Sequence, residues 1–149
     1  MSIDIRVSSP VKSGDPLEVG PLDGILTANL VSDCQLKAVT GTEKLIQQIY
    51  LEIVNDPLPD GTGSGLLTDL ITGPPDEGAL QAIAAAGVNR IRSNILEYQR
   101  NRAGSLPADE LLSSLRLISF SLADNRFDLR LEVTTVSGEV TVTPLVVSL

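Results

Sequence analysis

Histidine and tryptophan are absent from this sequence of 149 residues, and cysteine occurs once, at Cys34. Without histidine, the chain cannot contain a Ser-His-Asp triad or a Cys-His pair. A single cysteine cannot form an internal disulfide, and the first residues contain no apolar segment of the signal-peptide type, so we expect function outside an oxidising compartment. No apolar run approaches the roughly 18 residues of a transmembrane helix, so we expect no membrane-spanning segment.

Positive charge is scarce as well. The chain has 11 lysines and arginines against 19 aspartates and glutamates, which gives a formal net charge of −8. Because phosphate backbones and anionic membrane surfaces bind to basic faces, we expect neither nucleic acid nor membrane as a partner. All arginines except Arg6 lie in the second half of the chain. Chance explains this distribution as well as a surface for a carboxylate-rich partner does, and both interpretations stay open.

The sequence does contain a regular pattern of aliphatic residues, which predicts an α+β fold: two main helices packed on a C-terminal antiparallel β-meander. Residues 1–24 are rich in proline and glycine and predict an extended N-terminal arm. Residues 25–149 predict a single α+β domain, with one or two short strands expected within residues 25–39.

Two long helices are predicted in this domain. The first covers about residues 41–54, where aliphatic residues recur at helical spacing and Thr40 and Glu43 have the spacing of a capping box. The second covers about residues 75–100, with Pro75 at the first helical position. The glycine- and proline-rich loop between them contains four aliphatic residues, which predict a docked loop with a short helical turn.

The last third of the chain changes to a period of two residues. Phe127, Leu129, Leu131 and Val133 alternate with charged residues, which predicts a strand with one buried and one solvated face. We expect three strands, over about residues 115–122, 126–136 and 139–147. The last should lie at an edge, because Pro144 has no amide proton to donate to a neighbouring strand.

Side chains that could carry out catalysis are few. Glu97, Asp109 and Glu110 qualify as a hydrolase pair by residue type alone, and acids near helix ends and turns are usually solvated surface. The segment Gly61-Thr-Gly-Ser-Gly65 lacks the Gly-Lys-Ser/Thr ending of a phosphate loop, so we predict a docked turn. We therefore expect no enzymatic activity and no cofactor.

An interaction surface is what remains. The predicted C-terminal meander leaves a strand edge to which another chain could add a strand. An ordinary edge strand, protected by Pro144 and neighbouring charges, explains the same pattern, and both interpretations stay open.

Five segments follow one another in an ordered succession. They are Gly41-Thr-Glu-Lys-Leu-Ile-Gln-Gln-Ile, the loop from Asn55 to Gly65 with Gly65-Leu-Leu, Ile95-Leu-Glu-Tyr-Gln, Leu106-Pro-Ala-Asp-Glu-Leu-Leu, and Phe127-Asp-Leu-Arg-Leu-Glu-Val. This succession, over about residues 35–140, resembles the sheath-initiator (baseplate wedge) family of contractile-tailed bacteriophages. The resemblance implies a structural protein of the virion tail baseplate, synthesised in the host cytoplasm and present in about six copies around the tail. It implies tail sheath, baseplate wedge and tail tube proteins as partners.

The resemblance also implies where the partner binds. The C-terminal sheet of the family is similar to the strand-exchange domain of sheath subunits, so residues 117–142 would form the docking sheet. The expected partner-binding residues are Arg100, Arg102, Phe127, Leu129, Arg130, Val140 and Val142. Many members carry a Glu-Pro-Arg triplet after the long helix. Here that stretch is Glu97-Tyr-Gln-Arg100, without proline, so the family arginine falls on Arg100 or Arg102. The alternative function is a binding module outside the virion, either an adaptor or an assembly chaperone.

Overall fold

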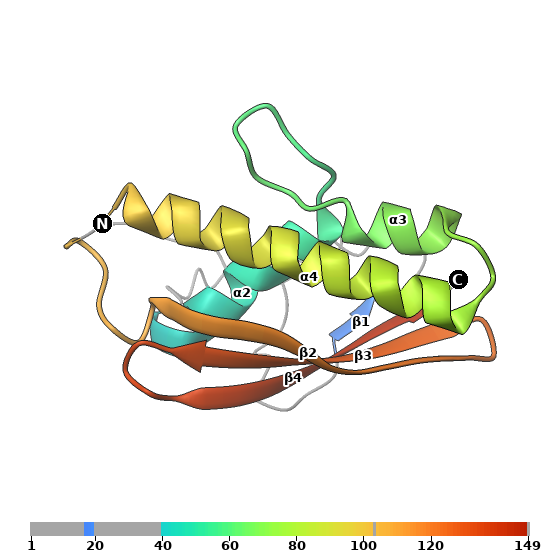
Figure 1. The fold of residues 1–149 in the computed structure, drawn as a ribbon. Helices are drawn as coiled ribbons and strands as arrows, with labels where there is room; N and C mark the ends of the chain where they lie inside the picture. The colour runs from blue at the N-terminus through green and yellow to red at the C-terminus, as the bar shows by residue number, and fades with distance from the viewer. Residues whose placement is uncertain (1–16, 20–39, 103, 149) are drawn as a thin grey trace, which may run out of the picture.

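The computed structural model describes residues 17–19, 40–102 and 104–148, which form a layer of helices on one face of a β-sheet (Figure 1). The two short strands expected within residues 25–39 lie outside these residues. The elements are β1 (Leu17–Val19), α2 (Gly41–Val54), α3 (Leu66–Thr72), α4 (Glu77–Arg100), β2 (Leu112–Ala123), β3 (Arg126–Thr135) and β4 (Val140–Ser148). The α+β fold predicted from the sequence is confirmed.

The sheet has the strand order β1-β4-β3-β2. Strands β2, β3 and β4 form an antiparallel meander, and β1 pairs in parallel with β4, with Leu17 opposite Leu145. The prediction that the last strand lies at an edge is therefore wrong for Leu145–Val147, which β1 covers, and holds among the described residues only for the first part of β4. Pro144 removes only its own amide proton, and the residues that follow it keep theirs. Residues 17–19, which fall in the predicted arm, are part of the sheet.

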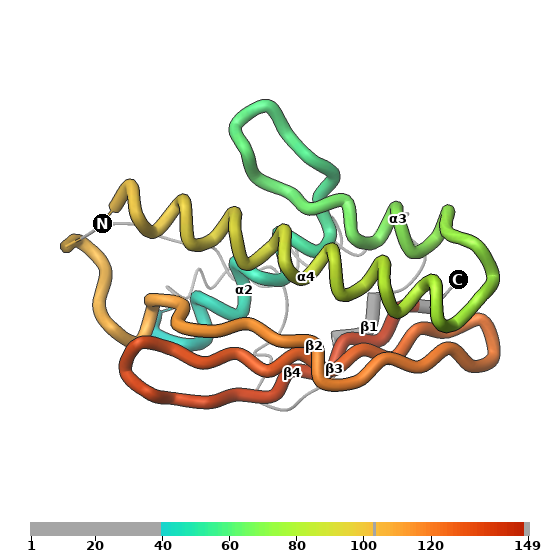
Figure 2. Tube along the Cα trace, viewed as in Figure 1, coloured from blue at the N-terminus to red at the C-terminus, as the bar shows by residue number. Residues whose placement is uncertain are grey.

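The trace in Figure 2 shows the helices on one side of the sheet, and the buried apolar side chains of both layers form one core. Along β3, buried residues alternate with exposed or half-buried ones, as the sequence pattern predicted. The inner face of the sheet contributes Leu115, Phe120, Phe127, Leu129, Leu131, Val133, Leu145 and Val147. The helices contribute Leu45, Ile49, Ile53, Leu66, Leu70, Leu80, Ala84, Val88, Ile91 and Ile95. Among the described residues, no helix is both long and apolar enough to cross a bilayer.

Helix α2 has the predicted bounds, but its predicted capping box is wrong, and the predicted start of α4 needs correction. Thr40 occupies the N-cap position of α2, but its side chain makes no capping hydrogen bond, and Glu110 Oε1 accepts the Gly41 amide proton instead. Helix α4 begins at Glu77 rather than at Pro75, since the Asp76 carboxylate accepts the Ala79 amide proton at 2.8 Å and acts as the N-cap. At α2, a contact with the distant Glu110 replaces the predicted capping box. At α4, the cap formed by Asp76 moves the start of the helix beyond Pro75.

Candidate interaction surface

The outer face of the sheet, which we define as the face away from the helices, carries three rows of side chains. Strand β3 contributes a charged row, Arg126, Asp128, Arg130 and Glu132. Strand β4 contributes an apolar row, Val140, Val142, Pro144 and Val146, and β2 contributes Arg116, Ser119 and Ser121. Val140 and Val142 are 58% and 41% exposed, so part of this row is in contact with solvent.

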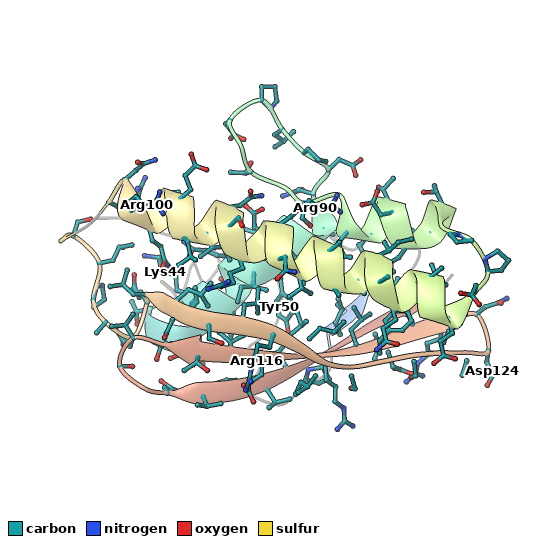
Figure 3. The ribbon with its side chains drawn as sticks, viewed as in Figure 1. Lys44, Tyr50, Arg90, Arg100, Arg116 and Asp124 are labelled. Atoms are coloured by element: carbon teal, nitrogen blue, oxygen red, sulfur yellow. The ribbon has the colours of Figure 1, made fainter. Side chains whose placement is uncertain are left out.

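Ion pairs neutralise most of the charge on the outer face. Arg116 pairs with Glu132 across the strands, and Arg126 pairs with Asp128 along β3 at 3.2 Å. Figure 3 shows Arg116 on the sheet layer, far from Arg100 at the end of α4. Arg130 is exposed and has no ion-pair partner among the described residues. Within β2, β3 and β4, the outer face therefore keeps one arginine without an ion pair.

An open depression of about 560 Å³ surrounds this arginine. It is lined by Ser119, Ser121, Arg126, Asp128, Leu129, Arg130, Pro144, Leu145 and Val146. The serines and the proline are small, and the longer Arg126 and Arg130 stand beside them, which produces the hollow. The side chains of Leu129 and Leu145 are buried on the inner face of the sheet, so these two residues line the depression with their backbone atoms.

Strand β2 is the longer of the two edge strands in the described sheet. This strand is 12 residues long, pairs with β3 on one side, and has no neighbour on the other side in the described sheet. Register shifts at Leu112/Ser114 and Leu117/Ser119 interrupt it, and the register is continuous from Ser119 to Ala123. Ile118, beside the second shift, is 49% exposed. The edge is thus accessible and carries an apolar side chain.

A buried polar cluster holds the start of β2 against two helices. Lys44 Nζ, on α2, lies 2.8 Å from Glu110 Oε2, and the side chains are 6% and 9% exposed. Gln99, near the end of α4, donates to the Glu110 carbonyl and accepts from the Leu112 amide, both at 2.9 Å. Glu110 is therefore a structural group. A hydrolase would need a carboxylate that can contact a substrate, and both oxygens of the Glu110 carboxylate already accept hydrogen bonds, one from Lys44 and one from the Gly41 amide.

The loop between α2 and α3 is fixed from within. The five amides of residues 61–65 all donate to groups of the protein, with acceptors in residues 52–60. One acceptor is Glu52 Oε2, which takes the Gly63 amide proton at 3.0 Å and also a hydrogen bond from Asn94. Hydrogen bonds from Thr62 lower the pKa of the Asp60 carboxyl. The segment therefore presents no free amides to a phosphate, which agrees with the docked turn predicted from the sequence.

The structure separates the residues predicted to bind a partner. Phe127 and Leu129 are 2% and 1% exposed and belong to the core, so their side chains cannot contact a docked chain. The alternation predicted them on the buried face of the strand, and the structure confirms that face, so only their assignment as partner-binding residues is wrong. Arg130, Val140 and Val142 lie together on the outer face.

Arg100 lies apart from this face, at the end of α4 in the helix layer (Figure 3), and Arg102 follows two residues later, against Tyr98 of the same helix. Both are exposed, and the Arg102 guanidinium stacks 4.6 Å from the centre of the Tyr98 ring. Two separate surfaces thus contain the residues that the resemblance had grouped into one.

Sequence reasoning missed the exposure of Ile118 at the register shift and the place of Ser119 and Ser121 in a hollow of the outer face. The only signal was the alternation of Ser119 and Ser121 with apolar neighbours, which indicates a solvated face but not a hollow.

No family model matches this chain, and neither a curated protein nor a solved structure matches it. Within the described residues, no group of three potential metal-ligating side chains lies together.

Proposed function

We propose that this protein is a docking component of a larger assembly and accepts a strand from a neighbouring subunit at the edge of β2. The free edge carries the proposal, because unpaired backbone amides and carbonyls are a template for another chain. Natural edges are usually protected by proline, lysine, several charges or β-bulges, and the two register shifts of β2 leave its stretch from Ser119 to Ala123 continuous. Strand β2 contains neither proline nor lysine, and Arg116 is its only charged residue.

Within this class, we propose the role of a sheath initiator in a contractile phage tail. The support is the order of the five sequence segments that resemble the family, together with a C-terminal meander backed by two helices. The partners would be tail sheath, baseplate wedge and tail tube proteins, with about six copies in each virion. The role is structural and requires neither catalysis nor a cofactor.

Substitution of Ile118 by lysine tests the strand addition. Ile118→Lys places a charge on the β2 edge, where a charged side chain opposes pairing with another strand. Because Ile118 is 49% exposed, the change should leave the folded domain intact. Ile71→Lys, on α3, is the matched control, since Ile71 is 44% exposed and distant in sequence from the edge.

Particles assembled with each variant should differ in electron micrographs. We expect normal sheaths with Ile71→Lys and few or none with Ile118→Lys. Normal sheaths with Ile118→Lys would refute docking at this edge. Quantitative mass spectrometry of purified particles tests the assignment to the virion, because an adaptor or assembly chaperone outside the virion would be absent from them.

A further inference from the structure

We propose that the outer face of the sheet binds an extended partner segment in which carboxylates alternate with apolar side chains. One carboxylate would lie in the depression beside Arg130, and the apolar side chains would cover the β4 row. This inference deepens the proposed function by naming the chemistry of a partner, and it rests on that function only in assuming that the protein docks another chain.

The charges on the outer face favour an acidic partner segment. Within β2, β3 and β4, the outer face carries three arginines and two carboxylates, and each of these two carboxylates pairs with an arginine, Glu132 with Arg116 and Asp128 with Arg126. Arg130 remains, in a chain whose net charge is −8. An acidic segment is repelled by most of this protein but finds here a guanidinium with no ion pair among the described residues, which can donate two parallel hydrogen bonds to a carboxylate.

The lining of the depression supports the same ligand. Ser119 lies opposite Arg130 in the register of β2 and β3, and Ser121 lies opposite Asp128. No hydrogen bond of either serine hydroxyl occurs within the described part of the chain. A carboxylate bound by Arg130 would therefore find hydroxyl donors on the neighbouring strand.

The apolar row of β4 explains why the partner segment should also carry apolar side chains. Pro144 lies opposite Arg130 on β4, with Val142 and Val146 on either side of it along the same face. Side chains of one face recur every second residue along a strand. A partner strand that places carboxylates over the β3 row thus needs apolar side chains within reach of β4. A nucleic acid would require a larger basic surface than one free arginine provides.

A peptide-binding measurement on the full-length protein tests the inference. The probe is a fluorescein-labelled peptide of alternating valine and glutamate, and a second peptide has glutamine in place of glutamate. Fluorescence anisotropy should show tighter binding of the glutamate peptide, and its affinity should fall as salt is added. Arg130→Gln should weaken that binding about two- to fivefold, the size of an exposed ion pair.

Arg92→Gln is the matched control, because Arg92 is exposed on α4 and has no ion pair within the described residues. It should bind the glutamate peptide like the wild type. Equal affinity for the two peptides, or equal loss in the Arg130 and Arg92 variants, would overturn the inference, and so would no binding at all. Because this measurement needs no sheath, its failure leaves the Ile118→Lys result on strand addition unaffected.

Discussion

Removal of one partner of the Lys44–Glu110 ion pair should lower the free energy of unfolding by about 3 kcal/mol. The pair is 2.8 Å long, and both side chains are almost fully buried. Breaking such a pair leaves an uncompensated charge in the interior, which costs about 3–5 kcal/mol. In Lys44→Met, the Glu110 carboxylate keeps its hydrogen bond from Gly41 and the positive end of the α2 dipole, so the lower end of the range applies.

Urea and thermal unfolding followed by circular dichroism measure this loss. At about 2–4 °C for each kcal/mol in a chain of this size, the melting temperature should fall by about 6–12 °C. Arg90→Met is the control, because it breaks the exposed ion pair with Asp69 and should cost less than about 1 kcal/mol.

The double variant Lys44→Met/Glu110→Gln separates the ion pair from simple loss of packing. Because both charges are gone, it should be at least about 2 kcal/mol less destabilised than the sum of its single variants. If the two single changes add to within about 0.5 kcal/mol, the groups are not coupled, and the account of this cluster is refuted.

Three further predictions follow from the same structure. Gly63→Ala should cost at least about 2 kcal/mol in urea unfolding, because a Cβ atom there would lie 2.1 Å from a backbone oxygen at a φ of +83°. Gly61→Ala, at a similar φ but in open space, should cost only about 1 kcal/mol, and equal losses would refute the role of the clash. Asp76→Ala should lower the free energy of unfolding by about 1 kcal/mol and Thr40→Ala by almost nothing, since of these two side chains only Asp76 caps a helix. A larger loss in Thr40→Ala than in Asp76→Ala would show instead that Thr40 caps α2, as the sequence predicted. Burial, partly offset by the neighbouring Thr143 hydroxyl, raises the pKa of Tyr50 from 10.0 to about 12. The folded state thus favours the neutral phenol, whose stabilising effect is complete below about pH 10 and is lost as the pH rises through about 12. Tyr50→Phe should remove this alkaline loss in urea titrations at pH 9 to 12, and an unchanged pH profile would contradict the assignment.

The periodic parts of the fold were predictable from the sequence. Aliphatic residues at helical spacing located α2 and α4, and strict alternation located β3, because each element buries one face and the burial determines the pattern. The short strand β1 has no such pattern: three residues are too few for a period, and its partner lies at the other end of the chain.

Buried polar groups were not predictable for a different reason. Lys44 and Glu52 are 5% and 9% exposed on a helix whose other polar positions are more accessible. Their partners, Glu110 and the Gly63 amide, come from distant or irregular segments, and a sequence period carries no information about such pairs. The same limitation applies to the candidate surface. Alternation placed Arg130 and Phe127 on opposite faces of β3, but only the packing of the helices decides which face a partner can reach.

The position of β1 beside β4 has a consequence for synthesis of the protein. A ribosome adds about 5–20 residues each second, so β4 emerges roughly 6–25 s after β1. Until then, β1 has no partner strand, β3 lacks its neighbour on one side, and the core lacks Leu145 and Val147. The sheet therefore closes only after translation has reached the last strand. Chains that end before Val140 and have been released from the ribosome should be sensitive to protease in β3, whereas the completed chain should be protected.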